Sequence, residues 1–307
     1  MPQLIGLHVY PLKSAYRLSP ESATVEPWGL TGDRRWMLVD ATGRAVTQRE
    51  EPALGQLRVH SAPDGSLTLT APDGATLRVE APSAAAGAPL AEVEIFGALF
   101  KTALAPAETG AWFGERFGER FARRVGAVRL VHLDDPAAAR AVHPDFAHGH
   151  ETVSLADGFP LQIASTASLA ALNEHLAADH PDDPRKSAAL PMERFRPNLV
   201  IDGLEPWAED GWRRVRVGEV TFRVAKPCGR CVITTTDQET GARRGPEPLR
   251  ALGRHHRFGK SLAFGVQVVP ERPEGRTGDQ LGTVRLGDAF TVLEEGPRLV
   301  PDGPEED

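Results

Sequence analysis

The stretch KPCGRCVITTTDQETG, residues 226–241, contains both cysteines of a chain of 307 residues, Cys228 and Cys231. Two thiols in this spacing serve as half of a zinc site, as a dithiol that cycles with a disulfide, or as the source of one thiolate for another metal. Two buried cysteines with a purely structural role are a fourth option. The surrounding residues have to distinguish these uses.

Zinc and dithiol chemistry are both disfavoured by the context. A structural zinc site needs a second pair of ligands, no third cysteine exists, and the adjacent His255 and His256 would point apart on a strand or a helix. A thioredoxin-like dithiol lies where a strand passes into a helix, whose dipole lowers the thiol pKa. The β-branched run VITTT predicts a strand after Cys231 instead.

The neighbours of the cysteines favour a thiolate beside an anionic metal cofactor. Lys226 and Arg230 flank the thiols, and nearby cations stabilise a thiolate. The threonines at 234–236 would place hydroxyls on both faces of the expected strand, and Asp237 follows it. A positively charged, polar-lined thiolate suits a soft metal with anionic ligands.

The composition indicates a soluble globular protein of one large or two moderate domains. Its formal net charge is -7, with 35 Lys and Arg residues against 42 Asp and Glu residues, which argues against a broad nucleic-acid surface. The start, MPQLIGLHVYPLKS, lacks the features of a signal peptide, and no apolar run is long enough to span a bilayer. We expect a cytoplasmic protein that binds neither nucleic acid nor membrane.

The pattern along the chain predicts a β-rich α+β fold. Short alternating runs in the first hundred residues are separated by turns, including Asp-Gly pairs at 64–65 and 73–74. A nucleotide-binding G-x-G-x-x-G loop is absent. Later strands are expected at residues 127–133, 196–202, 212–226, 231–236 and 285–293.

Two amphipathic helices interrupt these strands. Residues 107–124 place Phe113, Phe117 and Phe121 on one stripe of a helix. A second helix is expected after Ser165, which can cap it, with apolar positions at Leu169, Leu172 and Leu176.

Six blocks of sequence carry a family resemblance. They are YPLKS (10–14), GDRRWMLVD (32–40), VTQREEP (46–52), FRPNLVI (195–201), the cysteine stretch with the preceding WAEDGWRRVRVGEV, and FGKSLAFG (258–265). In this order they resemble the MOSC-domain family, named for the C-terminus of molybdenum cofactor sulfurase. The resemblance is closest to the two-domain branch that includes the mitochondrial amidoxime-reducing component and its bacterial relatives, and it extends from about residue 5 to 293.

The resemblance implies the domain organisation. An N-terminal β-barrel-like domain would span residues 1–125, and a MOSC β-barrel domain with a few helices would span 126–295. The molybdenum cofactor, a molybdopterin, would lie between them. Residues 296–307, rich in acidic residues and proline, are expected to form a flexible tail.

The resemblance also implies the ligands. Molybdenum would be held by the pterin dithiolene, two oxygens and the thiolate of Cys231, with Cys228 as a neighbour. Lys13 and Ser14 match the family's pterin-contacting pair, and a cation plus a hydroxyl suits a phosphate-bearing ligand. Arg34 matches an arginine of the family's second block.

Residue chemistry adds candidates to that set. Ser165 and Thr166 lie at an expected helix N-terminus, which attracts anions, although capping alone explains Ser165 nearly as well. Arg196, beside the stiff Pro197, can grip a phosphate or a pterin edge bidentately. The predicted cofactor-binding residues are Lys13, Ser14, Arg34, Arg49, Ser165, Thr166, Arg196, Asn198, Arg230 and Cys231.

Two residues are assigned to catalysis, Cys231 as the metal ligand and Asp237. The carboxylate of Asp237 would accept a hydrogen bond near the metal or relay protons, and the sequence does not choose between these roles. Gln267 stands where animal relatives carry a tyrosine near the cofactor, so that contact is polar or lost in this chain.

The implied function is a molybdenum-dependent oxidoreductase that reduces N-hydroxylated compounds such as hydroxylamines, amidoximes and base analogues. The chain has no further cysteines for an iron–sulfur cluster, so electrons would come from a separate flavin, cytochrome b5 or ferredoxin type protein. The main alternative is a non-catalytic cofactor carrier or sulfur-transfer module. A zinc-binding or scaffold protein is the more distant alternative.

Overall fold

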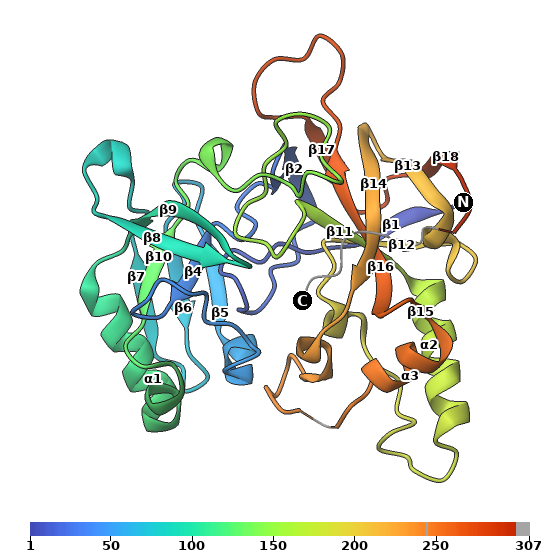
Figure 1. Ribbon diagram of the computed structural model, residues 1–307, viewed down its shortest axis with the longest axis horizontal. Coiled ribbons are helices and arrows are strands. Elements are labelled where there is room, and N and C mark those ends of the chain that lie inside the picture. The colour runs from blue at the N-terminus through green and yellow to red at the C-terminus, as the bar shows by residue number, and fades with distance from the viewer. Residues whose placement is uncertain (244, 299–307) are drawn as a thin grey trace.

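The computed structural model of the chain describes residues 1–243 and 245–298. It confirms the β-rich α+β fold and shows two lobes, the first built mainly from the N-terminal part of the chain (Figure 1). Among the described residues, no helix is long and apolar enough to cross a membrane. Of the tail predicted at residues 296–307, residues 299–307 lie outside the described residues.

The second lobe is built on an eight-stranded sheet that curls until its ends meet. The end strands approach at a bridge between Gln3 and Ala289, supported by a hydrogen bond from the amide of Leu4 to the carbonyl of Asp288. The strand order is β1 (Gln3–Leu7), β12 (Leu199–Asp202), β11 (Leu161–Ser165), β16 (Ser261–Pro270), β14 (Val220–Gly229), β13 (Trp212–Val217) and β18 (Phe290–Glu295), and β15 (Arg257–Phe258) pairs with β16.

The apolar face of this sheet forms the largest core of the molecule. Successive side chains on a strand point to opposite faces. Strand β11 therefore contributes odd-numbered residues to this core, and strand β16 contributes even-numbered ones. Buried members from four strands include Leu7, Ile163, Phe222 and Val266. The residues between them on β11 and β16 face away from this core.

The first lobe contains two antiparallel sheets and a helix. One sheet has the order β4 (Trp36–Val39), β10 (Arg129–His132), β9 (Ala98–Leu104) and β8 (Leu90–Ile95). The other is an antiparallel meander whose two turns are the predicted Asp-Gly pairs, with Gly65 and Gly74 at positive φ. Its strands are β5 (Arg58–Ser61), β6 (Leu67–Thr70) and β7 (Thr76–Val79).

Strand pairing connects distant parts of the chain in both lobes. β1 pairs with β12 in the second lobe, whereas β10 pairs with β4 and β9 in the first. A fourth sheet joins two N-terminal strands to a C-terminal one, in the order β17 (Gly282–Arg285), β2 (Ser22–Glu26) and β3 (Gly29–Leu30). The chain therefore enters the second lobe before it builds the first.

Three α-helices lie within the described residues: α1 (Ala107–Val125), α2 (Thr166–Asp179) and α3 (Leu249–His255). α1 buries Phe113 and Phe121 as expected, but Gly118 interrupts it with φ 74° and ψ −175°. The stripe of phenylalanines was visible in the sequence, whereas the break was not predicted. Short 3-10 helices cover Pro52–Gln56 (η1), Ala84–Ala86 (η2), Pro136–Ala138 (η3), Met192–Phe195 (η4), Ala208–Gly211 (η5) and Val232–Thr235 (η6).

The predicted strand at VITTT is wrong, because Val232–Thr235 form the 3-10 helix η6. The hydroxyl of Thr234 donates to the carbonyl of Cys231 at 2.9 Å, and that of Thr235 donates to the carbonyl of Val232 at 2.7 Å. Such local side-chain bonds to the backbone compete with strand pairing, so they override the β propensity of the run.

Candidate functional site

A cavity of about 160 Å³ lies where the first lobe meets the curled sheet. Its walls come from segments far apart in the chain, including the loop after β1, the loop after β4, the start of β11 and the end of β14. Eight of the predicted cofactor-binding residues line it: Lys13, Ser14, Arg34, Arg49, Arg196, Asn198, Arg230 and Cys231.

Cys231 is the half-buried thiol of the cavity, and Cys228 lies deeper. Cys231 directly precedes η6, and Cys228 belongs to the end of β14. Burial raises the pKa of the Cys228 thiol, against the opposing charge of Arg230. The two cysteines therefore differ in environment, and Cys231 is the more accessible of the two.

Arg230 anchors the segment that carries these thiols. Its backbone N–H donates to the carbonyl of Leu262 at 2.7 Å, and its guanidinium donates to the carbonyls of Phe264 and Phe195. Burial lowers the pKa of Arg230, with the cysteines opposing that effect. Most of its N–H groups are already used, so Arg230 fixes Cys231 in place more than it binds an anion.

Asp157 joins two cations of the cavity lining. The ammonium of Lys13 donates to the carbonyl of Leu155 at 2.9 Å and pairs with Asp157, and Arg49 pairs with the other carboxylate oxygen at 3.0 Å. Partial burial would raise the pKa of Asp157, but these two cations outweigh it and hold that pKa well below its usual range. Burial lowers the pKa of Lys13 despite the pairing.

Two further arginines of the cavity lining share one aromatic ring, that of Tyr10. The guanidinium carbons of Arg34 and Arg196 lie 4.4 and 4.2 Å from the centre of the Tyr10 ring. Arg34 also donates to the side chain of Asn198 at 3.1 Å. Burial raises the pKa of Tyr10 to about 12 and lowers the pKa of Arg196 to about 10. Both guanidinium groups thus remain cationic at neutral pH, in fixed positions.

Backbone strain gathers at the same place. Five non-glycine residues among those described have positive φ, and Ser14 (68°), Arg34 (46°) and Arg196 (50°) are three of them. All three line the cavity. Left-handed backbone is unfavourable for such residues and persists mainly where surrounding structure enforces it, typically at functional sites.

The cavity is strongly positive. Its lining contains six cationic side chains and one carboxylate, that of Asp157. The cations are Lys13, Arg34, Arg49, Arg194, Arg196 and Arg230. The six cations repel one another in this partly dry site. The excess of positive charge therefore favours a ligand with several negative charges.

Three predicted site residues do not line the cavity. Ser165 is the last residue of β11 and Thr166 the first of α2, whereas the lining residues of β11 are at its start. Ser165 precedes α2, but its hydroxyl makes no capping bond, and the hydroxyl of Thr166 donates to Asp202. The helix N-terminus therefore does not line this cavity; Ser165 occupies the predicted N-cap position of α2, but without a side-chain capping bond.

Asp237 is the third residue outside the lining. Its carboxylate accepts from the amides of Glu239 and Thr240 at 3.0 and 3.1 Å, so it shapes its own loop. It also lies 3.7 Å from the guanidinium of Arg194, which does line the cavity. Asp237 thus reaches the cavity through one intervening side chain.

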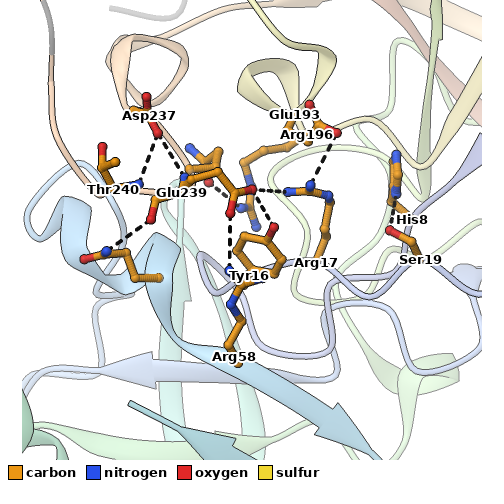
Figure 2. Close-up of polar contacts among 12 residues, drawn as sticks. His8, Tyr16, Arg17, Ser19, Arg58, Glu193, Arg196, Asp237, Glu239 and Thr240 are labelled. Atoms are coloured by element: carbon orange, nitrogen blue, oxygen red, sulfur yellow. Dashed lines mark hydrogen bonds and ion pairs between the residues drawn. The ribbon is translucent and has the colours of Figure 1, made fainter. Parts of the chain in front are cut away.

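The loop after Cys231 is held by the first lobe, as Figure 2 shows around Glu239. The carboxylate of Glu239 accepts from the hydroxyl of Tyr16 at 2.5 Å and from Arg17 and Arg58, each at 3.2 Å. Nearby, Gln48 and Gln238 exchange two amide hydrogen bonds of 2.9 Å. The position of the thiol therefore depends on contacts between the lobes.

Sequence reasoning missed Asp157, Arg194, Gln162 and the importance of Gln267, all of which line the cavity. Asp157 follows a loop and carries no local pattern. Arg194 stands two residues before Arg196 in MERFRPN, and that doubled arginine was the available signal. Within the described residues, no group of three or more His, Cys, Asp and Glu side chains is arranged to hold a metal ion.

Comparison with protein families gives two matches along the chain. Residues 1–120 match the model of the MOSC N-terminal beta barrel domain, and residues 150–291 match that of the MOSC domain. The two matched segments contain all eight of the predicted residues that line the cavity.

Individual relatives are similar at a moderate level. Mitochondrial amidoxime-reducing component 1 of Mus musculus is 29% identical over 302 residues, which cover 94% of this chain and 81% of that protein. Molybdenum cofactor sulfurase of Anopheles gambiae is 31% identical over 279 residues, which cover 87% of this chain and 34% of that protein. The crystal structure of the YUAD protein from Bacillus subtilis aligns over 94% of both chains with 10% identity and a TM-score of 0.38.

Proposed function

Because this chain belongs to the MOSC-domain proteins and joins a MOSC N-terminal β-barrel domain to a MOSC domain, we propose that its cavity binds the molybdenum cofactor and that the protein reduces N-hydroxylated compounds. The relatives named for amidoxime reduction cover nearly the whole chain, which supports this choice of reaction. Electrons would come from a separate redox protein.

The observation that carries the proposal is the donor set of the cavity. One half-buried thiol stands among six cations and a single carboxylate. A pterin dithiolene that bears a phosphate and binds molybdenum is polyanionic and needs one further soft ligand, so these residues fit it. When bound, this cofactor supplies a redox-active metal that can remove the oxygen of an N–OH group.

Cys231 would provide the metal ligand. The Cys231 side chain lies near Arg49. Burial alone would lower the pKa of Arg49, but the charges of Asp157 and the Cys231 sulfur outweigh burial, so the pKa of Arg49 is raised. Cysteine binds metals as the thiolate, and Cys231 is the more accessible of the two thiols in the cavity.

Arg34 and Arg196 would hold the anionic end of the cofactor. Their stacking on Tyr10 and their enforced backbone conformation fix the guanidinium groups before a ligand arrives. A planar guanidinium donates two parallel hydrogen bonds to a phosphate, and preorganised donors lose less entropy on binding. Arg230, by contrast, would keep the Cys231 segment in place.

Net reduction of a hydroxylamine to an amine and water takes up two electrons and two protons. Asp237 is proposed to act through Arg194, because its carboxylate lies 3.7 Å from the guanidinium of Arg194, which lines the cavity. In this role it orients a cavity cation and does not touch the substrate.

A direct experiment is to express the chain in a host that makes the cofactor and to measure bound molybdenum and pterin together with reduction of benzamidoxime by a dithionite-reduced dye. Turnover with stoichiometric cofactor supports the proposal. A protein without molybdenum and pterin would contradict it.

The similarity to molybdenum cofactor sulfurases favours a second candidate, a carrier of the cofactor or of sulfur. A protein that contains the cofactor, does not reduce benzamidoxime and accumulates persulfide on Cys231 would support that candidate. Mass spectrometry of the intact chain detects the persulfide as one added sulfur atom.

A further inference from the structure

Gln162 and Gln267 form an unusual pair in the wall of the cavity. They lie directly opposite each other on the antiparallel strands β11 and β16, and both line the cavity. Gln162 is 8% exposed. The Nε2 atom of Gln162 and the Oε1 atom of Gln267 are buried, and neither has a hydrogen-bond partner within the described chain.

This pair stands out from its strands. The neighbours Leu161 and Ile163 on β11, and Val266 and Val268 on β16, all belong to the buried apolar core on the opposite face. The two amides are thus the polar groups of this part of the sheet, and they face the cavity side. A buried donor or acceptor without a partner destabilises a fold, so such groups are usually satisfied by water or a ligand.

The chemistry of two neighbouring amides defines what they can recognise. Each primary amide carries donor and acceptor atoms, and a half-turn of its last torsion exchanges them. Directly opposed residues of an antiparallel pair have Cβ atoms about 5 Å apart. Two such amides can therefore offer one N–H and one C=O to two adjacent polar atoms of a flat ligand.

We propose that Gln162 and Gln267 together recognise a planar lactam edge, an adjacent ring N–H and C=O, of a molecule bound in the cavity. The inference rests on the proposed function, which supplies two sources of this edge. One is the pyrimidinone ring of the cofactor's pterin, and the other is an N-hydroxylated nucleobase substrate.

The test compares Gln162→Leu and Gln267→Leu with the control Gln280→Leu, whose glutamine is exposed and outside the cavity lining. Thermal unfolding of the cofactor-free full chain is measured first. Replacement of an unpartnered buried amide by an apolar side chain should leave the Tm unchanged or raise it. A marked fall in Tm for both cavity variants but not for the control would show that the amides serve the fold, and it would overturn the proposal.

Binding is measured in two arms. For the cofactor, pterin-6-carboxylate is titrated into the cofactor-free chain, and the half-time of cofactor loss is followed in the loaded chain. For the substrate, N4-hydroxycytosine is titrated into the loaded chain, with benzamidoxime, which has no lactam edge, as the control ligand. Each Leu variant should weaken binding about tenfold in at least one arm, the factor expected for one hydrogen bond.

The arm that changes identifies the source of the lactam edge. The proposal would be overturned if both Leu variants bound both ligands as tightly as the wild-type chain does. It would also be overturned if neither pterin-6-carboxylate nor N4-hydroxycytosine bound the wild-type chain. A wild-type chain that never acquires the cofactor would contradict the proposed function instead. The titration of pterin-6-carboxylate into the cofactor-free chain would still test whether the two glutamines recognise a lactam edge.

Discussion

The ammonium group of Lys13 pairs with the carboxylate of Asp157, although the two residues are 144 positions apart in the chain. The pair ties the loop after β1 to the segment before β11, and Arg49 binds the same carboxylate. One acidic side chain therefore sets the positions of two cavity cations.

Replacement of Asp157 by Asn should lower the free energy of unfolding at pH 7 by about 1–2 kcal/mol, because Lys13 would lose its charged partner in a largely buried position. The folded-state pKa of Asp157 lies below its unfolded value. Its stabilising contribution is thus full above pH ~4 and is lost as the pH falls through the folded-state pKa.

Urea unfolding of both chains at several pH values checks this expectation. The difference between wild type and Asp157→Asn should shrink as the pH is lowered from about 4. A constant difference across this range would mean that the stabilisation does not depend on the carboxylate charge.

Arg196→Lys should accelerate loss of the cofactor about tenfold even though the positive charge is kept. A lysine cannot donate two parallel hydrogen bonds or lie flat on Tyr10 in the same way. The measurement is the rate at which pterin and molybdenum leave the purified protein during dialysis. Arg44→Lys, at an exposed arginine paired with Glu94, is the matched control, and equal rates for the two variants would contradict the bidentate role.

Glu239→Gln should affect the site more than the fold. The carboxylate is about half exposed, so the loss of its charge should cost less than about 1 kcal/mol of unfolding free energy. The three contacts of its loop with Tyr16, Arg17 and Arg58 would however weaken, because an amide has no charge and one acceptor oxygen in place of two. Hydrogen exchange of residues 236–243 should increase, and turnover should fall with it; unchanged exchange in that loop would refute this role for Glu239.

The sequence predicted the class of fold because its signals are local. Alternating apolar residues and Asp-Gly turns identified the β5–β7 meander, and the phenylalanine stripe identified α1. The family blocks brought most of the cavity residues together before any geometry was known. These blocks are short segments whose side chains meet only in the folded chain, and eight of the predicted positions line one cavity.

The failures have non-local or competing causes. VITTT has strand-forming residues, but the hydroxyls of Thr234 and Thr235 bond to the preceding carbonyls and form η6 instead. Ser165 has the sequence of a cap, yet its hydroxyl is buried without a partner. The role of Asp157 depends on Lys13, which is 144 positions away in the chain, so no pattern around residue 157 could reveal it.

The central claim is that Cys231 is the cysteine that binds molybdenum. The most direct test is molybdenum per chain, measured by elemental analysis of wild type, Cys231→Ala and Cys228→Ala purified from a host that makes the cofactor, with circular dichroism to show that each is folded. We predict near-stoichiometric metal in wild type and Cys228→Ala, and at least a tenfold loss in Cys231→Ala. Stoichiometric molybdenum in folded Cys231→Ala would contradict the account.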